Sequence, residues 1–174
     1  MAASGNRGGH FIFSKAVCLV DIEQIIIRIK DGPNDITICK GAAESTLWWF
    51  ERQMRVVLPD DFKKLYRFSD GFESAEDAFR ILPLSEIFDN RCEKWRSGLP
   101  AKRFYFAEYL QYCDMWSVEM PDDKQVGYSI FCPTRNDENI VLTSSLVEFL
   151  NCFLAKGVFG ENGLYDWGDA VAEK

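Results

Sequence analysis

The sequence predicts an α+β protein in which a largely antiparallel β-sheet packs against N- and C-terminal helices. Three observations support this prediction. The first third of the chain places apolar residues at helical spacing with charged residues between them. Residues 103–143 then hold four short runs of strand-forming residues separated by turn residues, as expected for consecutive antiparallel strands. A last helical pattern follows Ser144.

The best supported element is a helix that begins at Pro59 and is closed by Gly71. Proline suits the first helical position because its missing N–H is not needed there. Asp60 and Asp61 follow in the first turn, where negative charge meets the positive end of the helix dipole. Glycine tolerates the left-handed backbone of a C-terminal cap. The apolar stripe of this helix consists of Phe62, Leu65 and Tyr66.

Two further helices are predicted before this one. The first runs from Leu19 to Lys30 and ends at Asp31-Gly32-Pro33. Residues 35–39 alternate and form either a short strand or an extended linker. The second helix runs from Ser45 to Arg55. Its inner face consists of Leu47, Phe50 and Met54, which places Trp48 on the flank and Trp49 nearly opposite that face.

After the helix at 59–71 we expect short elements. Residues 73–78 form a polar turn, residues 79–84 a strand broken by Pro83, and residues 85–88 a single helical turn capped by Ser85. Residues 90–102 are predicted as a loop or short helix. The later strands are expected at 103–106, 115–120, 127–132 and 140–143. A helix over 146–153 stops near Gly157, and a tail at 163–167 packs back through Leu164 and Trp167.

The length of 174 residues predicts one domain. We assign residues 1–10 to a flexible tail, because they are rich in Gly, Ser and Asn, and residues 11–174 to the domain. Phe11–Phe13 is a short apolar run that an edge strand would explain. No run of about 18 apolar residues occurs and no signal-peptide cleavage site is visible, so we expect no membrane partner.

The net charge of −7 argues against direct nucleic-acid binding, which needs a basic surface, and is compatible with a basic protein partner. The six cysteines are scattered, without a Cys-x-x-Cys pair. This spacing favours neither a zinc site nor a disulfide scaffold. We therefore expect free, mostly buried thiols and a cytoplasmic location.

We expect no catalytic residue, no cofactor and no metal. The single histidine, His10, falls on the predicted tail, where no rigid Ser-His-Asp or Cys-His arrangement is expected. Asp60-Asp61 suits a helix start, and Asp122-Asp123 suits a solvated turn. Adjacent acids do not face each other across a cleft, as glycosidase chemistry requires.

Several segments, in their order, carry a resemblance to a known family. The stretch Leu58-Pro59 through Phe62-Lys63 to Asp70-Gly71 resembles the signature helix and turn of the SMI1/KNR4 (SUKH) family. Many members have Asn-Gly where this chain has Asp70-Gly71. The other segments that resemble the family lie at 41–51, 79–87, 106–109 and 144–150. The resemblance covers roughly residues 41–167, and the strands after Tyr109 follow no family pattern.

The resemblance implies a SUKH-like α+β fold and a protein-binding module, most simply an immunity protein that binds and neutralises a cognate toxin, often a nuclease. An alternative is a regulatory or scaffold subunit of a host complex, as in fungal cell-wall synthesis. A small-ligand or hydrolytic role at the sheet face is a third hypothesis.

We predict the partner-binding residues from this resemblance and from charge. In the family arrangement the turn Asp70-Gly71-Phe72 lies beside the Leu-Pro-Leu strand, and Glu73, Glu76 and Asp77 add negative charge there. The alternative is that Gly71 only caps the helix and Phe72 only packs. Trp49 is either covered by the N-terminal helix or anchors a partner, because tryptophan is enriched at binding hot spots.

Overall fold

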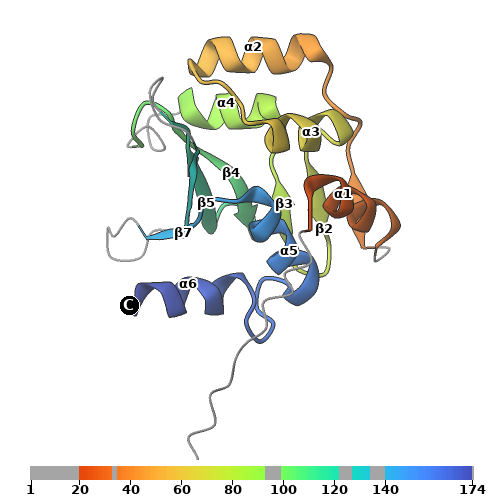
Figure 1. Cartoon of the computed structure of the whole chain (residues 1–174), viewed down its shortest axis with the longest axis vertical. Helices are drawn as coiled ribbons and strands as arrows, with labels where there is room; N and C mark the ends of the chain where they lie inside the picture. The colour runs from red at the N-terminus through yellow and green to blue at the C-terminus, as the bar shows by residue number, and fades with distance from the viewer. Residues whose placement is uncertain (1–19, 33–34, 93–98, 122–126, 134–139, 174) are drawn as a thin grey trace, which may run out of the picture.

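The computed structural model describes residues 20–32, 35–92, 99–121, 127–133 and 140–173. Within them, six helices and seven strands form the predicted α+β fold, with an open and entirely antiparallel sheet (Figure 1). The predicted tail at 1–10, the run at 11–13 and His10 lie outside the described residues. Among the residues described, no helix is long and apolar enough to cross a membrane.

The strands follow one another across the sheet in chain order, so each strand pairs with its neighbours in sequence, although helices lie within two of the connections. This meander explains why local turn signals predict so much of the topology. The strands are β1 (Ile36–Ile38), β2 (Phe72–Ser74), β3 (Phe79–Ile81), β4 (Arg103–Tyr109), β5 (Asp114–Glu119), β6 (Ser129–Phe131) and β7 (Val141–Thr143).

The helices α2 and α4 stack at one end of the sheet, and α6 lies at the other (Figure 1). The helix α1 packs against both α3 and α5. The helices are α1 (Ile22–Asp31), α2 (Glu44–Met54), α3 (Asp60–Phe68), α4 (Leu84–Cys92), α5 (Leu146–Lys156) and α6 (Leu164–Ala172).

The core lies between one face of the sheet and the helices α3 and α5. Phe79 of β3 stacks on Phe153 of α5 with ring centroids 4.2 Å apart. Phe106 of β4 packs against Phe149 of α5 at 5.2 Å and against Phe62 of α3 at 5.7 Å. All five rings are nearly or fully buried, so these aromatic contacts join the sheet to both helices.

The signature helix α3 forms with the predicted buried stripe but ends earlier than predicted. Pro59 is the N-cap residue, one position before the helix, and the helix stops at Phe68 with Ser69 as its C-cap. The prediction that Gly71 closes the helix is therefore wrong. Gly71 instead has φ of +92° in the turn into β2, where a Cβ would lie 2.7 Å from the Ile81 carbonyl oxygen.

Three other short elements also differ from prediction. The predicted polar turn at 73–78 begins as strand β2, because Phe72, Glu73 and Ser74 pair with both β1 and β3. The predicted single turn at 85–88 is the nine-residue helix α4. The tail after Gly163 is the helix α6, in which Leu164 is buried and Trp167 packs partly buried against the core.

Most of the described cysteines are not buried, although mostly buried thiols were expected. Cys132 is buried and Cys152 is half-buried, whereas Cys39, Cys92 and Cys113 are exposed. The expectation of mostly buried thiols is wrong because these three fall beside turns and at a helix end. Cys18 lies outside the described residues.

Candidate protein-binding surface

A row of mostly polar residues crosses five strands on the face of the sheet opposite the core. Pairing places them side by side, and successive residues in a strand point to opposite faces. Their neighbours Phe72, Phe79 and Ile81 face the core. The row consists of Thr37, Glu73, Arg80, Glu108 and Met115.

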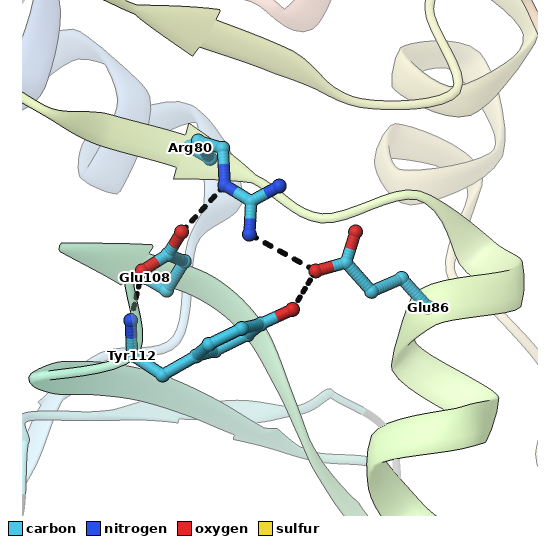
Figure 2. Close-up of polar contacts among 4 residues, drawn as sticks. All are labelled: Arg80, Glu86, Glu108 and Tyr112. Carbon is cyan, nitrogen blue, oxygen red and sulfur yellow. Dashed lines mark hydrogen bonds and ion pairs between the residues drawn. The ribbon is translucent and has the colours of Figure 1, made fainter. Parts of the chain in front are cut away.

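Arg80 is the centre of a polar network on this face. Figure 2 shows its guanidinium between two carboxylates, donating from Nε to Glu108 and from the terminal nitrogen to Glu86 of α4 at 3.0 Å. The Tyr112 hydroxyl donates to the same Glu86 oxygen, and the Tyr112 backbone N–H donates to Glu108. The network therefore connects β3, β4, α4 and the turn that follows β4.

The network gives the buried Glu108 carboxylate a charged partner. Glu108 is only 1% exposed, and an unpaired carboxylate at such a site would be costly. Burial by itself would lower the pKa of Arg80, but the hydrogen bond and charge of Glu108, together with Glu86, outweigh it and raise the pKa. Arg80 therefore stays protonated and supplies a positive charge beside Glu108.

The network also holds an unusual turn between β4 and β5. Three consecutive residues have left-handed backbone, Leu110, Gln111 and Tyr112, with φ of +47°, +52° and +69°. Each such non-glycine residue costs about 1 kcal/mol or more. The Leu110 N–H donates to the Ala78 carbonyl at 2.9 Å, and Tyr112 is fixed by the two glutamates. These bonds offset the cost and fix the shape of the turn.

Of the residues predicted to bind a partner, Glu73 and Glu76 are exposed, and Glu73 lies beside Arg80 in the polar row. Phe72 is 2% exposed and contacts Phe153 in the core. The acidic pair is thus accessible, while the Phe72 ring is not.

Asp70 and Asp77 bond to backbone groups. Asp70 accepts from the Leu84 N–H at 2.9 Å, at the first residue of α4. Asp77 accepts from the Val158 N–H at 3.0 Å, just after α5. Both carboxylates are partly buried. The bond of Asp70 links the turn before β2 to α4, and the bond of Asp77 links the β2–β3 turn to the end of α5.

Trp49 is half-buried and packs edge-on against Phe88 of α4, with ring centroids 5.0 Å apart. The two alternatives for Trp49 are cover by the N-terminal helix and a partner contact; the ring contact that the structure shows is with α4. The exposed ring on α2 is Trp48, 59% exposed, with the guanidinium of Arg52 4.8 Å from its centroid.

Sequence reasoning missed Arg80, Glu86, Glu108 and Tyr112 as a group. The available signal was the placement of Arg80 and Glu108 inside apolar strand patterns. Their pairing depends on the register between β3 and β4, which no local pattern reports.

The described residues offer little for acid–base or metal chemistry. Among them, no group of three or more His, Cys, Asp or Glu side chains is placed to hold a metal ion. A cavity of about 670 Å³ lies beside Lys102, Glu119 and Tyr128. Its described lining holds one carboxylate, Glu119, whereas hydrolysis by paired acids needs two that face each other.

Comparison with known proteins assigns most of the chain to a family. The model of the SMI1 / KNR4 family (SUKH-1) matches residues 41–152, which span α2 through most of α5. The chain therefore belongs to the SMI1/KNR4 (SUKH-1) family, whose members are generally non-catalytic. A comparison with curated proteins finds no match.

Proposed function

We propose that this chain is an immunity protein, which binds a cognate toxin one-to-one and neutralises it without chemistry. Membership of a family that commonly supplies immunity proteins carries the proposal. The net charge of −7 supports a basic target such as a nuclease toxin. An acidic inhibitor gains fast, electrostatically steered association with a basic cleft.

Within this proposal, Glu73 and Glu76 contact the basic partner directly, because both are exposed on β2 and the turn after it. Asp70, Phe72 and Asp77 hold that region in place through their bonds and packing. Trp49 contacts the partner through the exposed part of its ring, beside the contact between α2 and α4.

The proposal is tested with a toxin encoded beside this chain in its source genome. Co-expression should protect cells from the toxin, and the two purified proteins should elute as one complex in gel filtration. Cells that die despite co-expression, together with separate elution, would rule out the immunity role and favour the regulatory-subunit alternative.

The acidic contact is tested by the double substitution Glu73→Lys and Glu76→Lys. We expect the association rate with the toxin to fall by about tenfold or more at low salt, and the difference to shrink as salt screens the charges. Asp31→Lys is the control for charge reversal away from this region, compared per charge reversed, since Asp31 is exposed at the end of α1. Equal rates for the double variant and wild type at low salt would remove these residues from the interface.

A further inference from the structure

Three chain segments meet at one end of the sheet and form a surface that includes two of the predicted site residues, Glu76 and Asp77. We call residues 75–78, 109–114 and 157–163 the three-turn surface. They contain the β2–β3 turn, the β4–β5 turn and the loop between α5 and α6 (Figure 1). Both hairpin turns lie at the same end because the strands alternate in direction.

Direct contacts join the three segments. The Leu110 N–H donates to the Ala78 carbonyl at 2.9 Å, which links the two hairpin turns. The Val158 N–H donates to Asp77 at 3.0 Å, which links the α5–α6 loop to the β2–β3 turn. The rings of Tyr109 and Phe159 meet edge-on at 4.9 Å. The three-turn surface is therefore one continuous patch.

The patch has an apolar centre that consists of two exposed side chains. Phe159 is 63% exposed and Leu110 is 49% exposed, although large apolar side chains normally avoid water. Phe159 also stacks on Tyr165 at 4.8 Å, and Tyr165 packs against the buried Trp116 at 5.8 Å. A ring held in this way loses little conformational freedom on binding, which suits an interface anchor.

The surroundings of this apolar centre are acidic. Residues 75–78 contribute Glu76 and Asp77, residues 109–114 contribute Asp114, and residues 157–163 contribute Glu161, which gives four carboxylates and no Lys or Arg. The exposed Lys156 precedes the third segment at the end of α5. The patch thus combines an apolar centre with a negative rim.

We infer that the three-turn surface docks a protein whose contact surface places Lys or Arg side chains around an apolar centre. Charge complementarity selects this partner, and the negative rim argues against a second copy of the same chain. The inference rests on the proposed function, since a basic toxin has the required chemistry. The inference predicts that Leu110 and Phe159 contribute more to the binding free energy than Glu73 and Glu76 do.

The first test measures toxin affinity for the double variant Leu110→Asn and Phe159→Ser. Asparagine tolerates the left-handed backbone at position 110, and thermal unfolding checks that the variant is folded. We expect the Kd to rise by about tenfold or more, since exposed anchors carry most of the binding energy. The control Val57→Ser, at a residue 73% exposed before α3, should change the Kd by less than about twofold.

The second test needs no toxin and uses a short synthetic amphipathic helix with Leu on one face and Arg on both flanks. Titrated into isotope-labelled protein, it should shift amide signals in the three-turn surface, and the double variant should lose these shifts. If the double variant binds the toxin with the same Kd as wild type, the inference is overturned and the immunity role stays intact.

If wild type forms no complex with the toxin, the immunity role fails. The peptide titration then tests the inference alone, and amide shifts that are absent or lie outside the three-turn surface would overturn it.

Discussion

The Arg80 side chain pairs with a buried carboxylate and also contacts a helix and a turn. It bonds Glu108 within the sheet and Glu86 on α4, and its guanidinium lies 5.5 Å from the centre of the Tyr112 ring. Removing it leaves Glu108, which is 1% exposed, without its cation. The cost is then set by the stranded carboxylate more than by the lost attraction.

We therefore predict that Arg80→Met lowers the free energy of unfolding by about 2–4 kcal/mol, measured by urea denaturation. Arg67→Met is the matched control, because Arg67 pairs with Glu44 on the exposed surface. The control should change stability very little, since exposed ion pairs contribute little. Equal losses in the two variants would contradict the role assigned to the network.

The buried Tyr66 and the half-buried Tyr128 give the molecule a predictable sensitivity to alkali. Burial raises the pKa of Tyr66 well above its ordinary value of 10.0, and the charge of Asp70 adds to this. Burial likewise raises the pKa of Tyr128, with a further contribution from its hydrogen bond to Asp61. A folded-state pKa above the unfolded one means that stability is intact below about pH 10 and is lost as pH rises above it.

We predict that Tyr66→Phe flattens this alkaline loss of stability. Each buried tyrosine contributes a slope of about 1.4 kcal/mol per pH unit above its unfolded pKa, and the variant lacks one such group. Urea denaturation between about pH 9 and pH 11 measures the slope. An unchanged slope would show that Tyr66 ionises as readily in the folded protein as in the unfolded chain.

At the scale of elements, α4 depends on a residue from another part of the fold. Its first residue, Leu84, donates its N–H to Asp70, which lies after α3. A carboxylate at a helix start satisfies a backbone donor that has no partner within the helix and meets the positive end of its dipole. The bond also joins the end of α3 to the start of α4.

Two substitutions separate this structural role of Asp70 from a role in binding. Asp70→Ala should lower the free energy of unfolding by about 1 kcal/mol, as loss of a cap does elsewhere. Asp70→Asn keeps an acceptor oxygen and should retain most of the stability. If Asp70→Asn remains stable but weakens toxin binding, the charge itself contacts the partner; unchanged affinity would confine Asp70 to capping.

Sequence reasoning predicted well the elements whose stabilising interactions lie within their own segment of the chain. The helix α3 has its acidic first turn and buried stripe within one short segment, and α5 has its own N-cap in Ser145, which accepts from the Glu148 N–H. By contrast, β2 is three residues long and exists through pairing on both sides. The length of α4 was missed because its capping oxygen belongs to Asp70.

The candidate site was predicted only in part, for a related reason. Charge and resemblance led to Glu73 and Glu76, which are exposed. Burial of Phe72, the cover over Trp49 and the exposure of Phe159 depend on which elements meet in space. Sequence patterns report the face of an element but not what lies against that face.

At the scale of the whole molecule, the two faces of the sheet differ in what they contact. One face joins α3 and α5 in an aromatic core, while the other face and one sheet end display charged and apolar groups. A rigid support of this kind suits recognition, because little ordering remains to be done on binding. In this view the toxin is blocked by shape and charge and is not altered.

Titrating this protein into a fixed amount of the neighbouring toxin tests that view most directly, with toxin activity and intact toxin mass as the two readouts. We predict that activity falls in proportion to the protein added, ends at equal molar amounts and leaves the toxin mass unchanged. Inactivation by a small fraction of an equivalent, or a change in toxin mass, would show that the protein acts by chemistry and contradict the account.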